Sequence, residues 1–383
     1  MLKKIYNFTF VFLFWVLLSM PMIFANYTSG GVSEDENRTL AQFPAVKVDG
    51  KFNENFTREF EAWFMDHMGY RQEMITANAK IQYYGFERLL DKSDYYIGRN
   101  GDINYATYSM IIGYSHLNVR HESDVIRIGN SYQYVNDWLA EKGIQFYYVQ
   151  CFDKHSIYPE QFMASVNQVG EDSKTDQMVK YLKNNTTLNV ISMKDVLLDS
   201  KEKYEVYSNW GDPTHWTERG AFIGYQYVME SINANNDNKF PVLQEGDYDI
   251  VISNQAITLN GFITQEDMLE GFTIKEPKAY VADNSVMGDF SSDIRHRVFK
   301  NDSVDNDTKV LLMCDSYFNS YIVEDFAESF SEVWIIWGDY TNDLDVIIDM
   351  YNPDIVVYEC AERADRSELI YEFAQKLQTN ITE

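Results

Sequence analysis

The pattern of apolar and polar residues first marks off the N-terminal end of the chain. An apolar run without charges extends from Ile5 to Ala25 and follows the basic residues Lys3 and Lys4. A run of this length can cross a bilayer as one helix, and a short basic start is typical of an export signal. We therefore expect residues 1–25 to form a signal anchor, with a cleaved signal peptide as the alternative. The positive-inside rule then places the rest of the chain outside the cytoplasm.

The next part, residues 26–93, reads as a spacer followed by a small helical preamble. Its first half is polar and irregular up to Gly50, and aromatic residues then recur at spacings of four, four and three, at Phe52, Phe56, Phe60 and Trp63. This spacing predicts one face of an amphipathic helix. A second helix is expected over about 71–90, after the break at Gly69.

From about residue 94 the pattern changes to short apolar runs that alternate with helical stretches. The expected strands are Tyr95–Gly98, Gln145–Cys151, Thr187–Ile191, Lys309–Asp315, Glu332–Trp337 and Ile355–Glu359. The expected helices are Asp124–Lys142, Ser173–Asn184, Glu218–Ile232 and Ser367–Leu377. Strands that are apolar throughout and alternate with helices predict a mostly parallel sheet covered on both faces. We expect an α/β domain over 94–383, with a β-rich insertion at about 238–308.

Composition excludes several classes of function. The 383 residues carry 32 Lys and Arg against 59 Asp and Glu, a formal net charge of −27. Such a surface repels phosphate backbones, so we expect no nucleic-acid partner. No phosphate-binding loop or dinucleotide fingerprint is present, and we expect no cofactor. Cys151, Cys314 and Cys360 each end a predicted strand. A metal site with His215 or a disulfide is conceivable there, but we predict neither.

The first candidate for chemistry is the pair Asp315-Ser316, which ends a buried strand and runs into a helix. A serine there lies at the carboxyl edge of a parallel sheet, where open α/β folds bind ligands. The helix that follows would aim N–H groups at an anion beside the serine. The alternative is ordinary helix capping by Asp or Ser.

The second candidate is the turn from Asp212 to His215, which precedes a helix capped by Thr217. A serine nucleophile needs a base, and the base needs a carboxylate to fix its tautomer and orientation. One loop that carries both Asp212 and His215 supplies this if it lies against Ser316. The alternative is a surface turn in which Asp212 caps the chain and His215 only packs.

Together, these two blocks resemble the SGNH hydrolase group, and in particular its polysaccharide O-acetyltransferases of the alginate O-acetyltransferase (AlgJ/AlgX) and DHHW type. His215 precedes Ser316, which is the permuted block order of those relatives, and Trp216 and Gly220-Ala221 follow the histidine as they do there. Further agreement is spread along the chain, at Glu36-Asn37-Arg38-Thr39-Leu40 with Phe43-Pro44, at Asp66 and Arg71, at Gly98 and Gly101, at Lys154 with Tyr158-Pro159-Glu160, and at Glu362-Arg363. Cys314 stands where the relatives have Gly, and Pro213-Thr214 separates Asp and His where they have one residue.

The resemblance implies an SGNH-like three-layer sandwich and an extracytoplasmic O-acetyltransferase. Ser316 would be the nucleophile, His215 the base and Asp212 its orienting carboxylate, with Tyr317, Arg363 and Lys154 as candidates for lining the site. For these three, packing or a salt bridge is the alternative role. The acceptor would be a cell-surface polysaccharide, and a multi-pass membrane O-acyltransferase would deliver the acetyl group. Two other functions stay open: an acetyl esterase with the same triad, and a carbohydrate-binding or assembly protein with a decayed triad.

Overall fold

The structure is a computed structural model that describes residues 2–27, 31–33, 38–90, 94–208, 214–237, 239–259 and 263–382. By its internal contacts the chain forms two compact units, which we describe separately. The first comprises residues 1–91 with 259–263, and the second comprises 92–258 with 264–383.

The first unit begins with an apolar helix, α1 (Leu2–Ile23). Its segment Tyr6–Ile23 is long and apolar enough to cross a membrane, and no other described helix meets that test. The remaining elements of the unit are β1 (Val32–Ser33), β2 (Arg38–Thr39), β3 (Lys47–Val48), β4 (Lys51–Phe52), α2 (Phe56–His67) and α3 (Arg71–Phe86).

The aromatic face predicted for this region is present on α2. The ring of Phe43 lies edge-on against Phe56, Phe60 and Trp63, with the nearest centroid 4.8 Å away. Trp63 is buried, whereas Phe52 precedes the helix and is largely exposed. This aromatic cluster holds the chain segment before α2 against the helix.

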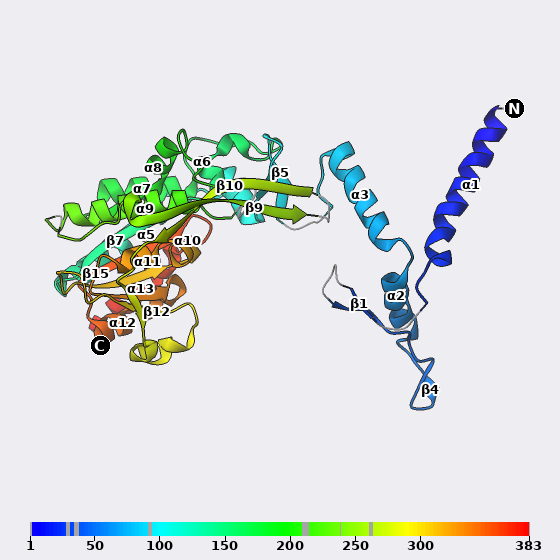
Figure 1. The fold of residues 1–383 in the computed structure, drawn as a ribbon. Coiled ribbons are helices and arrows are strands. Elements are labelled where there is room, and N and C mark those ends of the chain that lie inside the picture. The colour runs from blue at the N-terminus through cyan, green and yellow to red at the C-terminus, as the bar shows by residue number, and fades with distance from the viewer. Residues whose placement is uncertain are drawn as a thin grey trace. The chain divides into compact units, whose positions relative to one another are not determined.

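The second unit is built on a seven-stranded sheet (Figure 1). Its spatial order is β11 (Tyr280–Ala282), β12 (Arg297–Lys300), β14 (Glu332–Trp337), β13 (Lys309–Cys314), β15 (Ile355–Ala361), β7 (Gln145–Cys151) and β8 (Asn189–Ser192). The five strands from β14 to β8 are parallel, while β12 and β11 continue the sheet antiparallel at one edge. This confirms the predicted α/β fold with a mostly parallel sheet.

Helices cover both faces of this sheet. Successive residues of a strand point to opposite faces, so Val310 and Leu312 of β13 join one core while Leu311 and Met313 join the other. The first core is closed mainly by α8 (Met193–Ser200), α9 (Glu218–Ala234), α10 (Ser316–Tyr321) and α11 (Val323–Ala327). The second is closed by α5 (Glu122–Glu141), α7 (Lys174–Asn185), α12 (Leu344–Tyr351) and α13 (Ser367–Thr382). Two short helices, α4 (Tyr108–Tyr114) and α6 (Lys154–Ile157), lie in the connections.

Two segments differ from the simplest reading of the sequence. The predicted strand at Tyr95–Gly98 forms β5 (Tyr95–Ile97), which pairs only with β6 (Ile103–Tyr105) and stays outside the main sheet. Within 238–308, β9 (Tyr248–Leu259) pairs with β10 (Ile263–Ile274), but β11 and β12 belong to the main sheet. The strand β12 is apolar at its centre, since Val298 and Phe299 are both buried.

Candidate active site

Ser316 lies at the carboxyl end of the central strand of the sheet. The strand β13 pairs in parallel with β14 on one side and β15 on the other, and Asp315 and Ser316 follow its last residue, Cys314. The chain leaves β13 towards β14 and later returns to the opposite side, which makes this edge a topological switch point. The fold therefore places Ser316 where open α/β sheets bind their ligands.

The turn that carries Ser316 is fixed by the buried carboxylate of Asp315. One oxygen, Oδ1, accepts the Tyr317 N–H (3.0 Å), and the other accepts the Ala361 N–H (2.7 Å) and a guanidinium N–H of Arg366 (3.1 Å). The Asp315 N–H donates to Glu359 (2.8 Å). Asp315 is thus the helix cap that the alternative reading expects, and it also locks the serine turn to β15.

His215 reaches Ser316 from the loop before α9. Its Nε2 lies 2.8 Å from Ser316 Oγ, although the two residues are 101 positions apart in the chain. Its other ring nitrogen, Nδ1, lies 2.8 Å from Thr214 Oγ1. Asp212, the predicted orienting carboxylate, lies outside the described residues. The structure therefore brings together the serine and the histidine of the predicted triad.

The residues after His215 explain how its loop is held. Trp216 is buried, and its ring lies 5.3 Å from that of Tyr317 and 6.1 Å from that of Phe318 on α10. Thr217 caps α9 by accepting the Gly220 N–H (3.0 Å). A Cβ at Gly224 would come within 2.8 Å of the Trp216 ring, so the absence of a side chain lets the indole lie against the helix.

Tyr317 and Arg363 contact the backbone of the His215 loop. The Tyr317 hydroxyl lies 3.1 Å from Asp153 Oδ1 and 3.3 Å from the Thr214 carbonyl oxygen. Arg363 donates to the same carbonyl (2.5 Å), and its Nε lies 3.4 Å from Asp153 Oδ1. The two side chains therefore hold the peptide next to His215, and their lining of the site stays a prediction.

Lys154 is anchored through a different set of contacts. Its Nζ donates to Asn104 Oδ1 (2.6 Å) and to the Ser208 carbonyl oxygen (3.1 Å). Burial lowers the pKa of Lys154 to about 8, a shift that nearby carboxylates oppose. These contacts fix the backbone just before residues 209–213, and the site-lining role of Lys154 stays a prediction.

A buried group beside the site was missed by the sequence analysis. Asp153, His155 and Glu362 offer ligand atoms that all lie within 4.8 Å of one another, so they are the described residues best placed to hold a metal ion. The group already has internal partners, because Glu362 accepts the Asp153 N–H (3.1 Å) and the Ser156 hydroxyl (2.7 Å). Burial and the neighbouring Asp153 raise the pKa of Glu362 to about 8. A usable signal existed, since Asp153 comes two residues after the end of β7 and Glu362 directly follows β15.

The fold and the site define a class. A three-layer α/β sandwich with a serine after its central strand, and a histidine in hydrogen-bond contact with that serine, is the arrangement that the sequence resemblance implies. Residues 123–281 match the model of the family described as "SGNH hydrolase-like domain, acetyltransferase AlgX". The matched segment contains His215 and ends before Ser316.

The chain is similar to several solved structures at low sequence identity. Bacillus cereus PatB1 with a sulfonyl adduct superposes with a TM-score of 0.50 at 18% identity, over 67% of this chain and 94% of that one. The O-acetyltransferase domain of Pseudomonas putida AlgJ gives 0.45 at 12% identity, over 74% of this chain and 100% of that one. A DHHW family protein from Eubacterium siraeum gives a TM-score of 0.42 at 14% identity, over 64% of this chain and 88% of that one. No curated protein matches the chain.

Proposed function

We propose that the protein is an extracytoplasmic O-acetyltransferase that moves an acetyl group, through an acetyl-serine intermediate, to a hydroxyl of a cell-surface polysaccharide. The observation that carries this proposal is the 2.8 Å contact between His215 Nε2 and Ser316 Oγ at the carboxyl edge of the central strand. It is the contact a base needs in order to take the proton of a serine nucleophile.

In the first half-reaction, Ser316 Oγ attacks the carbonyl carbon of an acetyl donor while His215 Nε2 takes the hydroxyl proton. The bond from the carbonyl carbon to the leaving group then breaks, and the leaving group receives that proton from the imidazolium. In the second half-reaction, an acceptor hydroxyl attacks the acetyl-serine ester and gives its proton to His215, which returns it to Ser316 Oγ. The free enzyme is regenerated and the sugar holds the acetyl ester.

The surrounding residues have supporting roles in this proposal. Asp212 orients His215 and stabilises its cation, and Thr214 Oγ1 lies against the same imidazole nitrogen. The Ser316 N–H is one donor to the oxyanion. The next amide, that of Tyr317, does not take this role because it already donates to Asp315. The helix α1 anchors the protein in the membrane, beside a multi-pass acyltransferase that delivers acetyl groups from the cytosol.

The test uses the full chain in detergent micelles, with p-nitrophenyl acetate as donor and an oligosaccharide as acceptor. Turnover should fall by about 10⁴- to 10⁶-fold in each of Ser316→Ala, His215→Ala and Asp212→Ala, because the triad acts as a unit. For the same reason, the loss in a double or triple variant should be no larger than the loss in a single one. Asp212→Ala should be the mildest, because this residue orients rather than transfers the proton. Ser231→Ala, which removes a hydroxyl bonded within α9, is the control and should leave turnover unchanged.

Three outcomes would contradict the proposal in different ways. Activity that survives in Ser316→Ala would mean that another residue is the nucleophile. Release of acetate with no acetylated oligosaccharide would favour the esterase, which differs in admitting water to the acetyl-enzyme. Wild-type protein that neither turns over substrate nor labels at Ser316 with a fluorophosphonate would favour the decayed binding protein.

A further inference from the structure

A groove opens directly beside the Ser316–His215 pair. It has a volume of about 580 Å³ and lies between the start of α9, the base of the β9–β10 pair, β12, and the helices α10 and α11. Tyr321, the last residue of α10, lines the groove, and its ring lies 5.8 Å from the ring of His215. Asn319 and Ser320, on the same helix as Ser316, also line it. Ser316 and His215 do not themselves line the groove, and Tyr321 connects its wall to the ring of His215.

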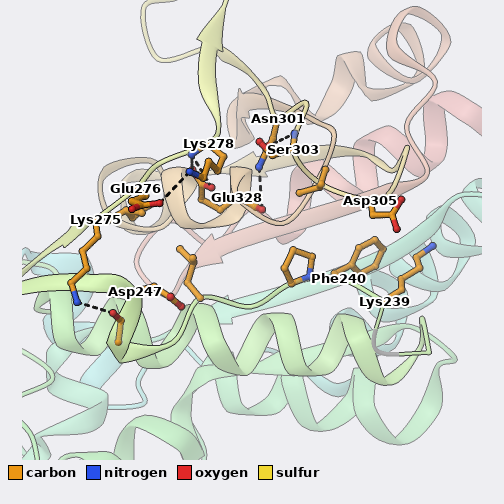
Figure 2. A pocket seen from close by; sticks show the side chains of 15 residues that line it. Lys239, Phe240, Asp247, Lys275, Glu276, Lys278, Asn301, Ser303, Asp305 and Glu328 are labelled. Carbon is orange, nitrogen blue, oxygen red and sulfur yellow. Dashed lines mark hydrogen bonds and ion pairs between the residues drawn. The ribbon is translucent and has the colours of Figure 1, made fainter.

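The groove continues into a second and larger cavity. Both cavities are lined by Ile274 and Glu328, and the second has a volume of about 810 Å³ (Figure 2). Two of its three lysines have polar partners, since Lys278 pairs with Glu276 (3.3 Å) and Lys275 donates to the Gly246 carbonyl oxygen (2.8 Å). The third, Lys239, is exposed and lies over the ring of Phe240 at the far cavity. The two cavities together form a cleft that leads away from the serine, as a polymeric acceptor requires.

The inner wall of the groove is aromatic. Phe222, Tyr248 and Phe272 pack against one another with ring centroids 5.2 to 5.4 Å apart, and all three line the cavity. Apolar and aromatic walls with a few fixed polar groups are the usual lining of a ligand pocket. Such a wall suits the C–H face of a sugar ring.

The charged side chains that line the groove are mainly acidic. Four carboxylates line it, those of Glu218, Glu324, Asp325 and Glu328, against the single guanidinium of Arg297. Three of the four are bonded to the protein: Glu218 accepts the Phe272 N–H, Asp325 accepts the Tyr248 hydroxyl, and Glu328 accepts two backbone N–H groups. Glu324 is exposed and is directed at no described basic side chain.

Asp325 is buried among these carboxylates, and both conditions disfavour its charged form. Burial, followed by the neighbouring Glu324, Glu218 and Glu328, raises the pKa of Asp325 to about 7, and the hydrogen bond from Tyr248 opposes this rise. Arg297 adds little positive potential for a ligand, because its guanidinium is bonded to the carbonyl oxygens of Asn319. A low-dielectric wall that carries charge of one sign focuses that potential into the cleft.

We propose that this groove binds the acceptor glycan and selects one that is neutral or amine-bearing, against polyuronates and other polyanions. The inference rests on the proposed function and adds the chemical class of the acceptor to it. An anionic chain would place its carboxylates beside Glu324 and Glu218 with no free cation to meet them, and like-charge contacts of this kind are costly. A neutral or cationic sugar meets an aromatic wall and acceptor oxygens.

The test compares three acceptors of equal length with the full-length protein: a neutral β-glucan oligosaccharide, a chitosan oligosaccharide and an oligouronate. With p-nitrophenyl acetate as donor, we expect kcat/KM for transfer to the oligouronate to be at least about tenfold lower than for the other two at low salt. Glu324→Lys should raise transfer to the oligouronate by about tenfold and lower transfer to chitosan. Glu230→Lys, an equal change of charge at an exposed position of α9 away from the groove, is the matched control.

Binding to full-length Ser316→Ala, measured by calorimetry, separates this inference from the proposed chemistry. Neutral and chitosan oligosaccharides that bind more tightly than the oligouronate, with the order reversed by Glu324→Lys, would support the inference even if no acetyl transfer occurred. The inference is overturned if the oligouronate is the preferred ligand, or if Glu230→Lys changes acceptor preference as much as Glu324→Lys does.

Discussion

At the scale of single residues, the geometry of His215 depends on side chains that do not touch it by hydrogen bonds. Tyr317 and Arg363 converge on the carbonyl oxygen of Thr214, one peptide away from the imidazole. Both are tied to Asp153, which is almost fully buried. They act as positioning residues, since moving that peptide would move the base relative to Ser316.

Tyr317→Phe therefore tests positioning without removing a proposed catalytic group. A displacement of about 1 Å can cost on the order of 10²-fold in rate, so we expect kcat to fall by about 10- to 100-fold with KM little changed. Steady-state kinetics with p-nitrophenyl acetate give both constants. Tyr280→Phe is the control, because it also removes a hydroxyl bonded to an aspartate (Asp302, 3.1 Å) but lies on β11, the outermost strand of the sheet. Equal losses in both variants would contradict the positioning role.

Asp325 makes a second prediction, on the pH dependence of stability. Its pKa is about 7 in the folded protein against an ordinary value of 3.8, so the folded state holds this proton more tightly than the unfolded chain does. Its contribution to stability is therefore fully present below about pH 4 and is lost as the pH rises through 7. Asp325→Asn should remove this part of the decline in urea midpoint between pH 4 and 7.

The control for this measurement is Asp349→Asn on α12, whose side chain is 75% exposed. It should leave the pH dependence of the urea midpoint as it is in the wild type. If the urea midpoint of Asp325→Asn depends on pH between 4 and 7 as that of the wild type does, the Asp325 carboxyl titrates at an ordinary pKa.

At the scale of elements, the His215 loop and the helix α10 are joined by the packing of Trp216. The indole lies between α10 and the start of α9, and Gly224 leaves the space for it. The loop position is thus set by helix-to-helix packing, in addition to the hydrogen bonds around Thr214.

Gly224→Ala should displace Trp216 and, with it, His215. The added Cβ would lie 2.8 Å from the indole ring, and overpacking of a core typically costs about 1–3 kcal/mol. We expect a lower thermal midpoint together with a loss of esterase turnover. Gly113→Ala in α4 is the matched control: nothing lies within 4 Å of its added Cβ, so it should be neutral or stabilising. A wild-type turnover in Gly224→Ala would show that the loop is held by other contacts.

The elements were predictable to different degrees. Strands such as β13 and β15 are buried on both faces, so most of their residues are apolar and stand out in the sequence. The edge strands β11 and β12 are short and pair antiparallel, and no local signal separates them from the hairpin before them. The Ser316–His215 contact was expected from two short motifs. The Asp153 group was not, because its members become neighbours only when β7 and β15 pair.

At the scale of the whole molecule, the length and exposure of α1 bear on where the protein works. Its side chains from Tyr6 to Phe14 are all exposed, and basic residues precede the run. We expect the second unit to lie outside the cytoplasm. Protease treatment of intact cells should degrade it, with a cytosolic protein as the protected control. Protection equal to that of the cytosolic control would contradict this location.

The position of β15 has a consequence for when the protein can act. It is the last strand of the sheet in the chain, yet it lies between β13 and β7 in the middle of the sheet. Residues on it and just after it, at Ala361, Arg363 and Arg366, hold both the serine turn and the histidine loop. Under the proposed function, a growing or partly exported chain would therefore contain the proposed nucleophile and base long before they can meet. We expect such a chain to be inert until its last described strand is in place, so that folding delays activity until export is complete.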